Sequence, residues 1–411
     1  MELKKYKLGD IIRIESISIT PKTDIKYNLY SLPSFDDNQK REEILGVNIQ
    51  SNKFIVPDRC ILFNKLNARF KRVWVINNND TNKICSTEFL PLIIDETKVD
   101  FYYCYYLLIS NHITNYLCGQ NTNTSNSHNR IDPTNFLSIN IEAPSLAEQK
   151  RIGNLLHSID QKIALNREIN QNLEAMAKQL YDYWFVQFDF PDENGKPYKS
   201  SGGKMVYNEK LKREIPEGWS VVKIKDIAQT YSGGTPTSTK QDYYVGGNIP
   251  WINSGELNNS IITSTTNFIT KLGLNNSSAK LYPQNTILVA LYGATAGKVS
   301  LLSFEACSNQ AICGVIPAEK ISITYIRYYL ASLYDYFITL SSGSARDNIS
   351  QDTIKNTILP IPHIDMLKKY EDIAKPLMDR VIANQKEVEN LIKQRDELLP
   401  LLMNGQVSVV D

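Results

Sequence analysis

The feature that most constrains this chain is an amphipathic helical pattern that occurs twice. In the first copy, apolar residues are spaced by fours and threes in two runs, first at Ile152, Leu156, Ile159 and Ile163 and then at Leu173, Ala177, Leu180 and Trp184. This spacing is typical of a long helix that packs along one face against another helix. The pattern recurs at an offset of 218 residues, within 365–403. Recurrence at a fixed offset indicates a duplicated unit and not two unrelated helices.

Two asparagines, Asn166 and Asn170, interrupt the apolar seam of the first helix, and Asn384 is the counterpart of Asn166. A buried Asn in such a seam lowers stability and can fix the register of the two helices. We therefore expect an antiparallel pair in which Asn166 and Asn384 lie near one another at mid-length. The predicted seam residues are Ile159, Ile163, Asn166, Leu173, Leu377, Val381, Asn384 and Leu391.

The regions that precede the two helices are diverged copies as well. Tyr102 with Tyr105–Leu107 recurs as Tyr325 with Tyr328–Leu330, and residues 131–144 match 349–362. We interpret these tyrosines, at helical spacing, as core residues rather than base-stacking ones. The surrounding short alternating segments are typical of strands. The sequence predicts an α+β chain with two mixed α/β domains at 1–145 and 219–363, long helices at 146–188 and 364–403, a Pro- and Gly-rich linker at 189–218, a tail at 404–411 and a shorter helix near 101–117.

Composition narrows the class of protein. The chain has 411 residues, of which 42% are hydrophobic and 22% charged, as in ordinary soluble proteins of two or three domains. No stretch approaches the ~20 apolar residues of a membrane span, and the charged N-terminus has no apolar signal region. Six cysteines without a CxxC pair and only four histidines argue against a zinc site. We therefore expect a cytoplasmic protein without a metal, whose net charge of +1 still allows local basic faces.

No segment carries a recognisable active site. Gly293–Val299 resembles a phosphate-binding loop, but three residues separate its glycines in place of four, and Val299 replaces a Ser or Thr. We interpret it as a glycine-rich turn between two strands, with backbone close to a ligand. Glu193 and Lys196 resemble part of a nuclease motif, but they are three residues apart where two are required. The sequence thus predicts no catalytic residue and no cofactor.

Polar loops are the better candidates for function. They carry Asn, Gln, Arg and Lys, which pair bidentately with base edges, and Ser, Thr and Gly, which suit phosphates. Because such loops recur in both copies, a DNA-reading surface is favoured over ordinary solvated turns. The candidate DNA-binding residues are Asn64, Lys65, Asn67, Arg69, Asn126, His128 and Arg130 in the first domain and Thr235, Thr237, Asn253, Ser254, Lys280, Tyr292, Lys298, Asn309 and Arg346 in the second.

With these motifs in this order inside a two-fold repeat, the chain resembles the specificity subunits of type I restriction–modification systems. The resemblance covers essentially the whole chain, and it is carried by residues 143–152, 180–185, 233–237, 249–256, 293–298 and 398–407. It implies two target-recognition domains that each read one half of a bipartite double-stranded DNA site, joined by two long antiparallel helices as a coiled-coil spacer. The resemblance also implies that these helices dock two copies of a methyltransferase subunit and that the assembly recruits restriction subunits.

Two departures from the family pattern lie in the second copy. Residues 361–368 do not repeat the usual pattern that begins the helix, and Pro376 lies inside the predicted helix, where it is expected to kink it or delay its start. Two other classes of protein stay open. A stand-alone methyltransferase or nuclease lacks every required motif here, and a coiled-coil adaptor without a DNA role does not account for the repeated polar loops.

Overall fold

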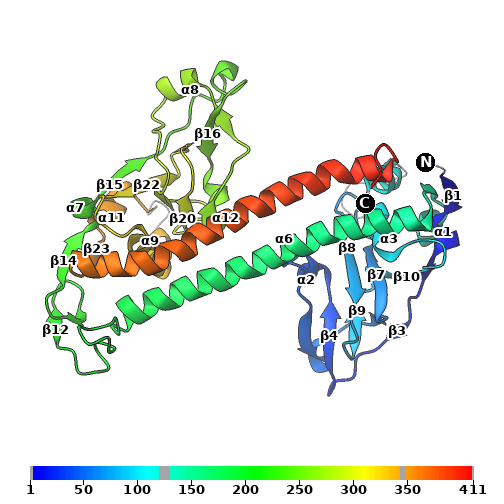
Figure 1. Ribbon diagram of the computed structural model, residues 1–411, viewed down its shortest axis with the longest axis horizontal. Coiled ribbons are helices and arrows are strands. Elements are labelled where there is room, and N and C mark those ends of the chain that lie inside the picture. The colour runs from blue at the N-terminus through cyan, green and yellow to red at the C-terminus, as the bar shows by residue number, and fades with distance from the viewer. Residues whose placement is uncertain (1–2, 120–129, 343–348, 410–411) are drawn as a thin grey trace. The chain divides into compact units, whose positions relative to one another are not determined.

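Two long helices run through the computed structural model, which describes residues 3–119, 130–342 and 349–409 (Figure 1). The first, α6, spans Leu146–Tyr181 and continues as a π-helical turn, Asp182–Val186; the second, α12, spans Ile364–Met403. The chain divides into two compact units, Met1–Ala164 with Glu389–Asp411, and Leu165–Val388. Each long helix therefore contributes residues to both units.

Three sheets and short helices form the first unit. Strand β1 (Lys4–Lys7) pairs with β11 (Asn140–Ala143). A four-stranded sheet has the order β2 (Ile12–Ile14), β10 (Phe89–Ile94), β7 (Arg59–Asn64), β8 (Val73–Asn77). A five-stranded sheet has the order β3 (Ser18–Ile19), β6 (Lys53–Ile55), β9 (Lys83–Cys85), β4 (Lys26–Tyr30), β5 (Glu42–Leu45). The helices are α1 (Leu8–Ile11), α2 (Leu32–Asp36), η1 (Gly46–Asn48), α3 (Phe101–Leu108), α4 (Asn111–Gly119) and α5 (Pro133–Leu137).

The second unit repeats this plan. Strand β14 (Ser220–Lys223) pairs with β23 (Ile358–Ile361). A five-stranded sheet has the order β15 (Ala228–Ser232), β22 (Ile312–Pro317), β19 (Ile287–Ala290), β20 (Val299–Leu302), β17 (Ile261–Ile262), and a three-stranded one the order β18 (Phe268–Ile269), β16 (Ile249–Ile252), β21 (Cys307–Ser308). The helices are α7 (Ile224–Ile227), η3 (Gln241–Tyr243), η4 (Ser254–Asn258), α8 (Lys271–Asn275), α9 (Ile323–Ser332), α10 (Tyr334–Ser342) and α11 (Gln351–Asn356).

The internal repeat predicted from the sequence is visible in these topologies. Strand β1 pairs with β11 and β14 pairs with β23, in each case the last strand before α6 or α12, and a short capped helix follows both β1 and β14. The backbone N–H of Lys7 donates to Asp10 at 2.7 Å, and that of Lys223 donates to Asp226 at 2.9 Å. The same local sequence signal therefore starts the same helix in both copies.

Tyrosines expected in the core are found there. Tyr106, Tyr325 and Tyr329 are buried, whereas Tyr102 is half-buried and stacks on His157 at 3.7 Å between ring centroids. The expected single helix over 101–117 is wrong, because α3 ends at Leu108 and α4 begins at Asn111. Ile109, Ser110 and Asn111 are weak helix formers, and the same break separates α9 from α10 in the other copy.

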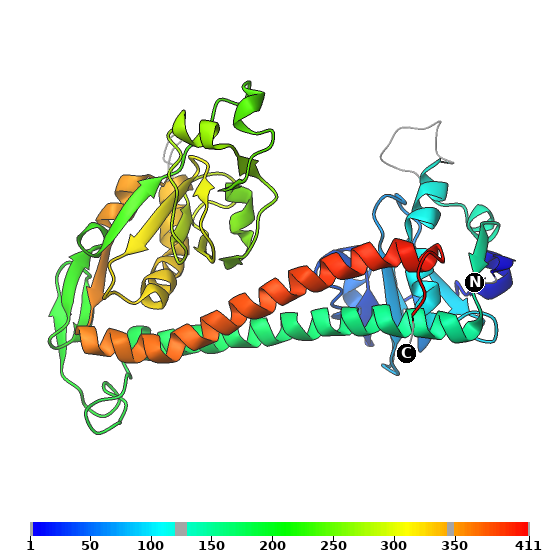
Figure 2. The same ribbon diagram turned by 45° about the horizontal axis from the view of Figure 1, so that its top comes forward.

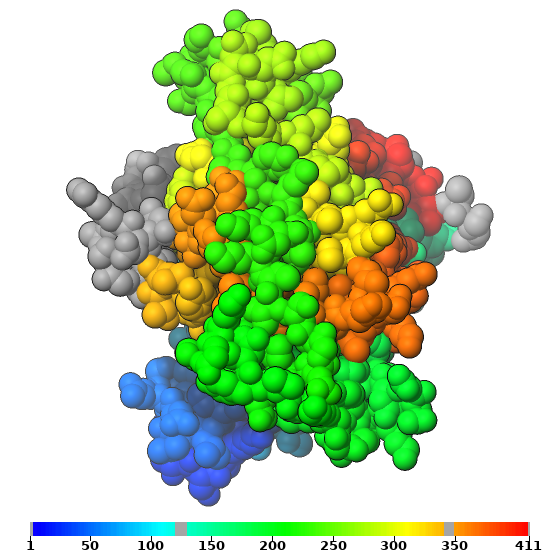
Figure 3. Space-filling model, turned by 90° about the vertical axis from the view of Figure 1, so that its left-hand side faces the viewer, coloured from blue at the N-terminus to red at the C-terminus, as the bar shows by residue number. Residues whose placement is uncertain are grey.

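Residues 189–218, expected to be a linker, contain an ordered hairpin in the second unit. Strand β12 (Met205–Asn208) pairs with β13 (Arg213–Pro216), and Ile215 belongs to the unit's core. The ring of Phe190 stacks between Tyr198 at 4.7 Å and Trp219 at 5.6 Å. Figure 3 shows the green surface of this segment beside the orange surface of the residues around the start of α12. The segment's role as a boundary between domains stays a prediction.

Proline 376 does not delay the second long helix, which begins at Ile364. An interior proline costs about 3 kcal/mol of helix stability. Tyr370, Ala374 and Met378, on either side of Pro376, are all buried in the core of the second unit. Burial of this face offsets the local penalty, because tertiary packing supplies most of the stability of helices in proteins.

In the second unit, the beginning of α12 runs beside the end of α6 (Figures 1 and 2). The amide of Asn384 donates to Oδ1 of Asn170 at 3.0 Å, and Asn170 donates to the carbonyl of Val381 at 3.3 Å. Asn166 donates to Oε2 of Glu387 at 3.1 Å. The partners run in opposite directions along the two helices, so this packing is antiparallel.

Asn166 and Asn384, which the sequence predicts to lie near one another, form their hydrogen bonds with Glu387 and Asn170. The repeat offset of 218 residues relates Asn384 to Asn166 and Asn170 to Val388. The equivalent of the Asn170–Asn384 contact would therefore join Asn166 to Val388. A valine offers no hydrogen bond, and Asn166 bonds Glu387 instead. Of the predicted seam residues, Ile163, Asn166, Val381, Asn384 and Leu391 are buried, and Ile159, Leu173 and Leu377 are half-buried.

In the first unit, the two long helices meet through a charged contact. Asp160 accepts from the hydroxyl of Tyr106 at 2.5 Å and from the guanidinium of Arg395 at 2.8 Å. Burial and the neighbouring Asp160 carboxylate both raise the pKa of Tyr106. The counterparts of Asp160 and Arg395 in the other copy are Met378 and Ala177, both buried. The same position in the repeat is thus polar in one unit and apolar in the other.

This difference predicts the behaviour of variants. Replacing Arg395 by Ala should lower the free energy of unfolding by about 1–3 kcal/mol, because the carboxylate of Asp160, three-quarters buried, loses its charged partner. Combining Arg395→Ala with Asp160→Met and Tyr106→Phe should restore stability to within about 1 kcal/mol of the wild type. Urea denaturation of the full chain measures both. A triple variant less stable than Arg395→Ala alone would contradict the equivalence of the two positions.

Among the described residues, none of the helices combines the length and the apolar character that crossing a bilayer requires. Within the same residues, no group of three or more His, Cys, Asp and Glu side chains could hold a metal ion. The six cysteines all lie in described segments and are unpaired, with five of them buried.

Candidate nucleic-acid interface

The motif loops of the second unit converge at one place. The loop that follows β15 lies against the loop that follows β21, since the N–H of Gly234 donates to the carbonyl of Ser308 at 2.8 Å. A Cβ atom added to Gly233 would lie 2.1 Å from the carbonyl oxygen of Asn309, and one added to Gly234 would lie 2.3 Å from the nitrogen of Ala279. Only glycine permits these approaches, which explains the two consecutive glycines of the motif.

Polar side chains cross from each of these loops to its neighbour. The hydroxyl of Thr235 donates to Oε1 of Gln310, and the amide of Asn309 donates to Oδ1 of Asn253 at 3.4 Å. The backbone N–H of Asn309 also donates to the carbonyl of Ile252 at 3.0 Å. Thr235 and Gln310 are exposed, and Asn253 and Asn309 are half-buried. The side chains of Thr235, Asn253, Asn309 and Gln310 therefore form one continuous polar edge, with hydrogen-bond donors and acceptors at the surface.

Two aromatic side chains donate hydrogen bonds to the backbone of the Gly-Gly-Thr-Pro loop in this edge. The indole N–H of Trp251 donates to the carbonyl of Gly234 at 3.0 Å, and the hydroxyl of Tyr244 donates to the carbonyl of Pro236 at 2.6 Å. Burial raises the pKa of Tyr244, so this hydroxyl keeps its proton as a donor at neutral pH. The Gly-Gly-Thr-Pro loop is thus fixed by side chains from the Pro-Trp-Ile-Asn segment.

The turn at 292–298 joins the antiparallel strands β19 and β20, as the sequence predicted. Gly293 and Gly297 have φ values of +87° and +77°, a region that favours glycine. The buried Thr295 donates to the carbonyl of Ser254 at 2.9 Å, and Lys298 donates to Oδ1 of Asn258 at 2.5 Å. This turn therefore supports the η4 helix that carries Ser254. A strand-to-strand turn is not the strand-to-helix connection of a phosphate-binding loop.

Three predicted residues of the second unit lie outside these contacts. Thr237 and Lys280 are exposed, and Tyr292 is half-buried and packs against the unit's main core. Arg346 lies outside the described residues, as do Asn126 and His128 of the first domain.

In the first unit, Asn64 does not present its amide to solvent. The side chain is 3% exposed, donates to the carbonyl of Leu66 at 2.6 Å and accepts from the N–H of Leu66 at 2.9 Å. The prediction that Asn64 contacts DNA is thus contradicted by its burial. Its position at the end of β7 lets it shape the loop that follows.

That loop, residues 65–72, brings several of the other predicted residues together. The N–H of Lys65 donates to the carbonyl of Glu88 at 2.9 Å, and the N–H of Ile131 donates to the carbonyl of Lys65 at 2.8 Å. Arg130 forms an ion pair with Glu88 at 2.6 Å. Lys65 and Arg130 are therefore adjacent, although 64 residues lie between them in the sequence.

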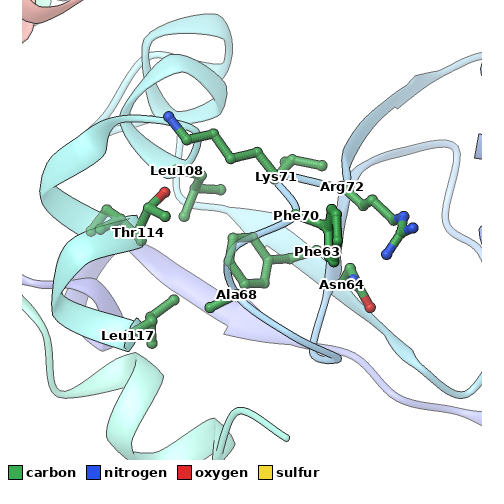
Figure 4. A pocket seen from close by; sticks show the side chains of 11 residues that line it. Phe63, Asn64, Ala68, Phe70, Lys71, Arg72, Leu108, Thr114 and Leu117 are labelled. Carbon is green, nitrogen blue, oxygen red and sulfur yellow. The ribbon is translucent and has the colours of Figure 1, made fainter. Parts of the chain in front are cut away.

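The end of the loop is cationic. Asn67 has a φ of +51°, which turns the chain so that Arg69 and Phe70 are exposed. Figure 4 shows Lys71 and Arg72 extending to opposite sides of the loop, where Lys71 donates to Asn111 at 2.8 Å. Burial lowers the pKa of Lys71. Between Asp58 and Asp80 the sequence has no acidic residue.

A family model described as "Type I restriction modification DNA specificity domain" matches residues 1–175 and 216–394. These two regions make up most of the chain, and each contains one of the repeated α/β folds and one of the loop clusters described above. The chain belongs to this family. The resemblance inferred from the sequence is confirmed, and the protein is a type I restriction–modification specificity subunit with two such domains.

Its relatives agree. The chain is 26% identical over 471 residues to the type I restriction enzyme HindI specificity subunit of Haemophilus influenzae, with 98% of this chain and 99% of the relative covered. It is 26% identical to the MjaIX specificity subunit of Methanocaldococcus jannaschii, covering 80% and 74%. The crystal structure of the S subunit of a type I restriction–modification system from M. genitalium superposes with a TM-score of 0.65 at 15% identity, covering 98% and 96%, which shows a shared fold.

Two surface groups were absent from the residues predicted as DNA contacts. Gln310 shares a hydrogen bond with Thr235, and the sequence signal was its place beside Asn309 in a polar loop. Phe70 is exposed at the end of the cationic loop, and its signal was an aromatic residue between Arg69 and Lys71. Gln310 and Phe70 can be identified as candidate DNA contacts only from the structure, which shows that both side chains are exposed.

The close approach of Gly233 gives a test of the loop architecture. Gly233→Ala should lower the free energy of unfolding by about 1–3 kcal/mol, because its Cβ atom would displace the backbone of Asn309. Gly255→Ala is the matched control, since nothing lies within 4 Å of a Cβ atom there. Its effect should stay within about 0.5 kcal/mol. Chemical denaturation of the full chain compares the two variants, and equal stability of both would contradict the described loop contact.

Proposed function

We propose that this specificity subunit reads an asymmetric, bipartite double-stranded DNA site, one half with each of its two domains. The observation that supports this most is the occurrence, in both copies of one fold, of an exposed polar loop cluster on a hydrogen-bonded scaffold. The scaffolds share their topology, but the loops differ in sequence. Two readers with one fold and different loops recognise two different half-sites, so the combined site is not a palindrome.

The proposed division follows the sequence. Residues 1–145 form the first target-recognition domain and 219–363 the second, with the long helices at 146–188 and 364–403, a linking segment at 189–218 and a tail at 404–411. The hairpin within 189–218 packs on the core of the second unit. In solution it therefore moves with that unit.

The proposed DNA contacts in the second domain centre on the edge formed by Thr235, Asn253, Asn309 and Gln310. Asn and Gln side chains pair bidentately with adenine, and Thr contacts bases or phosphates. Further contacts come from Thr237, Ser254, Lys280, Tyr292 and Lys298. In the first domain, Lys65, Asn67, Arg69 and Arg130 provide the contacts, while Asn64 shapes the loop from within.

The long helices act as an antiparallel coiled-coil spacer and as the docking surface for two methyltransferase subunits. The antiparallel packing of α6 on α12 in the second unit supports the first role. Duplication supports the second, because two equivalent helical surfaces in one chain offer two equivalent docking sites. Restriction subunits join through this complex. The chain itself performs no catalysis, and the methyl donor binds its partners.

A domain exchange tests this function. Replacing residues 219–363 with the matching domain of another specificity subunit should change one half of the methylated sequence and leave the other half unchanged. The altered half should follow the donor domain, because the loops that read it travel with that domain. Mapping of methylated bases in cells that carry the chimera and its methyltransferase subunit measures the outcome. A change in both halves together would contradict independent reading.

A methyl-transfer assay tests the alternative that this chain is itself an enzyme. The purified chain without its methyltransferase subunit should transfer no methyl group to DNA, whereas the reconstituted complex should. Activity of the chain alone would show a catalytic site within it.

The helix lengths predict the spacing of the two half-sites. α6 has 36 residues and α12 has 40, which correspond to about 54–60 Å at ~1.5 Å per residue. Reading loops set within these ends fit half-sites whose centres lie about one to one and a half DNA turns apart. Inserting seven residues after Asn172 and seven after Asn390 should widen the gap by ~10 Å, or about three base pairs. Methylation mapping should show unchanged half-sites. A gap that ignores the insertion would contradict the spacer role.

A further inference from the structure

Phe70 is the most exposed aromatic residue in the described parts of the chain, with 56% of its surface open to solvent. It lies near the end of the loop between β7 and β8, in the segment that also carries Lys65, Asn67 and Arg69. Single exposed apolar residues are common on protein surfaces and carry no meaning alone. Here the side chain is both rigidly supported and surrounded by positive charge.

The support comes from Arg72. Its guanidinium carbon lies 4.9 Å from the centroid of the Phe70 ring, and the guanidinium forms two hydrogen bonds to Asp36, at 2.7 and 2.8 Å. The hydrogen bond from Arg72 lowers the pKa of Asp36, so the carboxylate stays ionised at neutral pH. One part of the ring thus packs on a guanidinium that is itself fixed, and the exposed part is held in place.

The backbone adds to this support. The N–H of Phe70 donates to the carbonyl of Asn67 at 3.0 Å, and the N–H of Arg72 donates to the carbonyl of Phe70 at 2.7 Å. Asn67 has a positive φ, which few residue types adopt readily. These bonds define a tight turn with the phenyl ring near its outer end.

The positive charge of the loop around the Phe70 ring indicates an anionic ligand. Lys65, Arg69, Lys71 and Arg72 are the charged residues of the 65–72 loop, and all are cationic. Lys71 and Arg72 leave the loop on opposite sides of Phe70 (Figure 4). An aromatic ring between cations suits a polyanion whose apolar bases lie between charged phosphates.

We propose that Phe70 is a stacking wedge, which inserts the exposed part of its ring at a base step of the DNA bound to the first domain. This inference rests on the proposed DNA-reading function and names a contact of a different kind from the polar ones. The cations beside it hold phosphates while the ring replaces the stacking that one base loses. Wedges of this type part a base step and kink the duplex, so that easily unstacked steps are preferred at that position.

The first measurement is affinity. The full chain, assembled with its methyltransferase subunit, is used to enrich binding sites from a pool of duplexes with a randomised core. On the enriched duplex, Phe70→Ala should weaken binding about 10-fold or more, and Phe70→Trp should retain it. The dependence of affinity on salt should not change, because no charge is removed. Tyr207→Ala, which removes a second exposed aromatic residue outside the proposed interface, is the control and should bind as the wild type does.

The second measurement detects stacking itself. 2-Aminopurine is placed in turn at each position of the half-site read by the first domain, and its fluorescence reports loss of base stacking. The wild-type complex should unstack one position, and Phe70→Ala at saturating concentration should leave that position stacked. Equal affinity of Phe70→Ala and wild type, or the absence of any unstacked position, would overturn the wedge.

Two further outcomes are informative. If affinity falls when thymine is replaced by uracil and no base unstacks, Phe70 contacts a thymine methyl group and the wedge is overturned. If the wild-type complex enriches no sequence at all, the proposed DNA-reading function fails, and the wedge fails with it. Enrichment by the wild type together with an unaffected Phe70→Ala variant would overturn the wedge alone.

Discussion

Each long helix has to satisfy two cores with a single stripe of apolar residues. In α6, Ile152 and Leu156 pack in the core of the first unit, and Tyr181 packs in the core of the second. In α12, Tyr370 belongs to the second unit and Leu402 to the first. A helix that contributes to two cores cannot shift along its axis or rotate without disturbing both. This constraint explains why the helical pattern is the strongest periodic signal in the sequence, while the sheets diverge.

The polar contacts of the helices are local solutions to this common constraint. Asn170 with Asn384 in one unit forms a buried hydrogen bond, and Asp160 with Arg395 in the other forms a partly buried one at a position that is apolar in the second copy. The counterparts Ala177 and Met378 show that the position does not require charge. Polar pairs of this kind contribute little net stability but penalise every other register, because a shifted helix leaves them unpaired. Register is thus specified in each unit by a different pair.

The parts of the structure that follow from periodicity could be predicted, and the parts that follow from loop geometry could not. The seam, the two-fold repeat and the buried tyrosines all depend on spacing along the chain. The burial of Asn64 depends on a turn that bends back onto the backbone of Leu66, and no spacing encodes it. The hydrogen-bond partner of Asn384 is Asn170, and the 218-residue offset, which equates Asn384 with Asn166, does not predict this contact. The hairpin at 205–216 was hidden because Pro, Gly and Lys suggest a flexible segment, whereas Ile215 and the Phe190 stack anchor it.

The two proposed DNA-reading surfaces differ in chemistry although the two units share a fold. In the second unit, glycines at 233 and 234 let three loops share hydrogen bonds, so the edge formed by Thr235, Asn253, Asn309 and Gln310 is polar, uncharged and fixed. In the first unit, the 65–72 loop carries cations, but Arg59 and Arg72 are engaged by Glu96 and Asp36 and their charge is partly neutralised within the protein. The net charge of the chain is only +1, so attraction to DNA depends on local groups of cations, and each phosphate contact is worth a slope of about −0.9 in the salt dependence of binding. In the proposed function, selectivity between sequences rests on directional hydrogen bonds in the second unit and on stacking in the first.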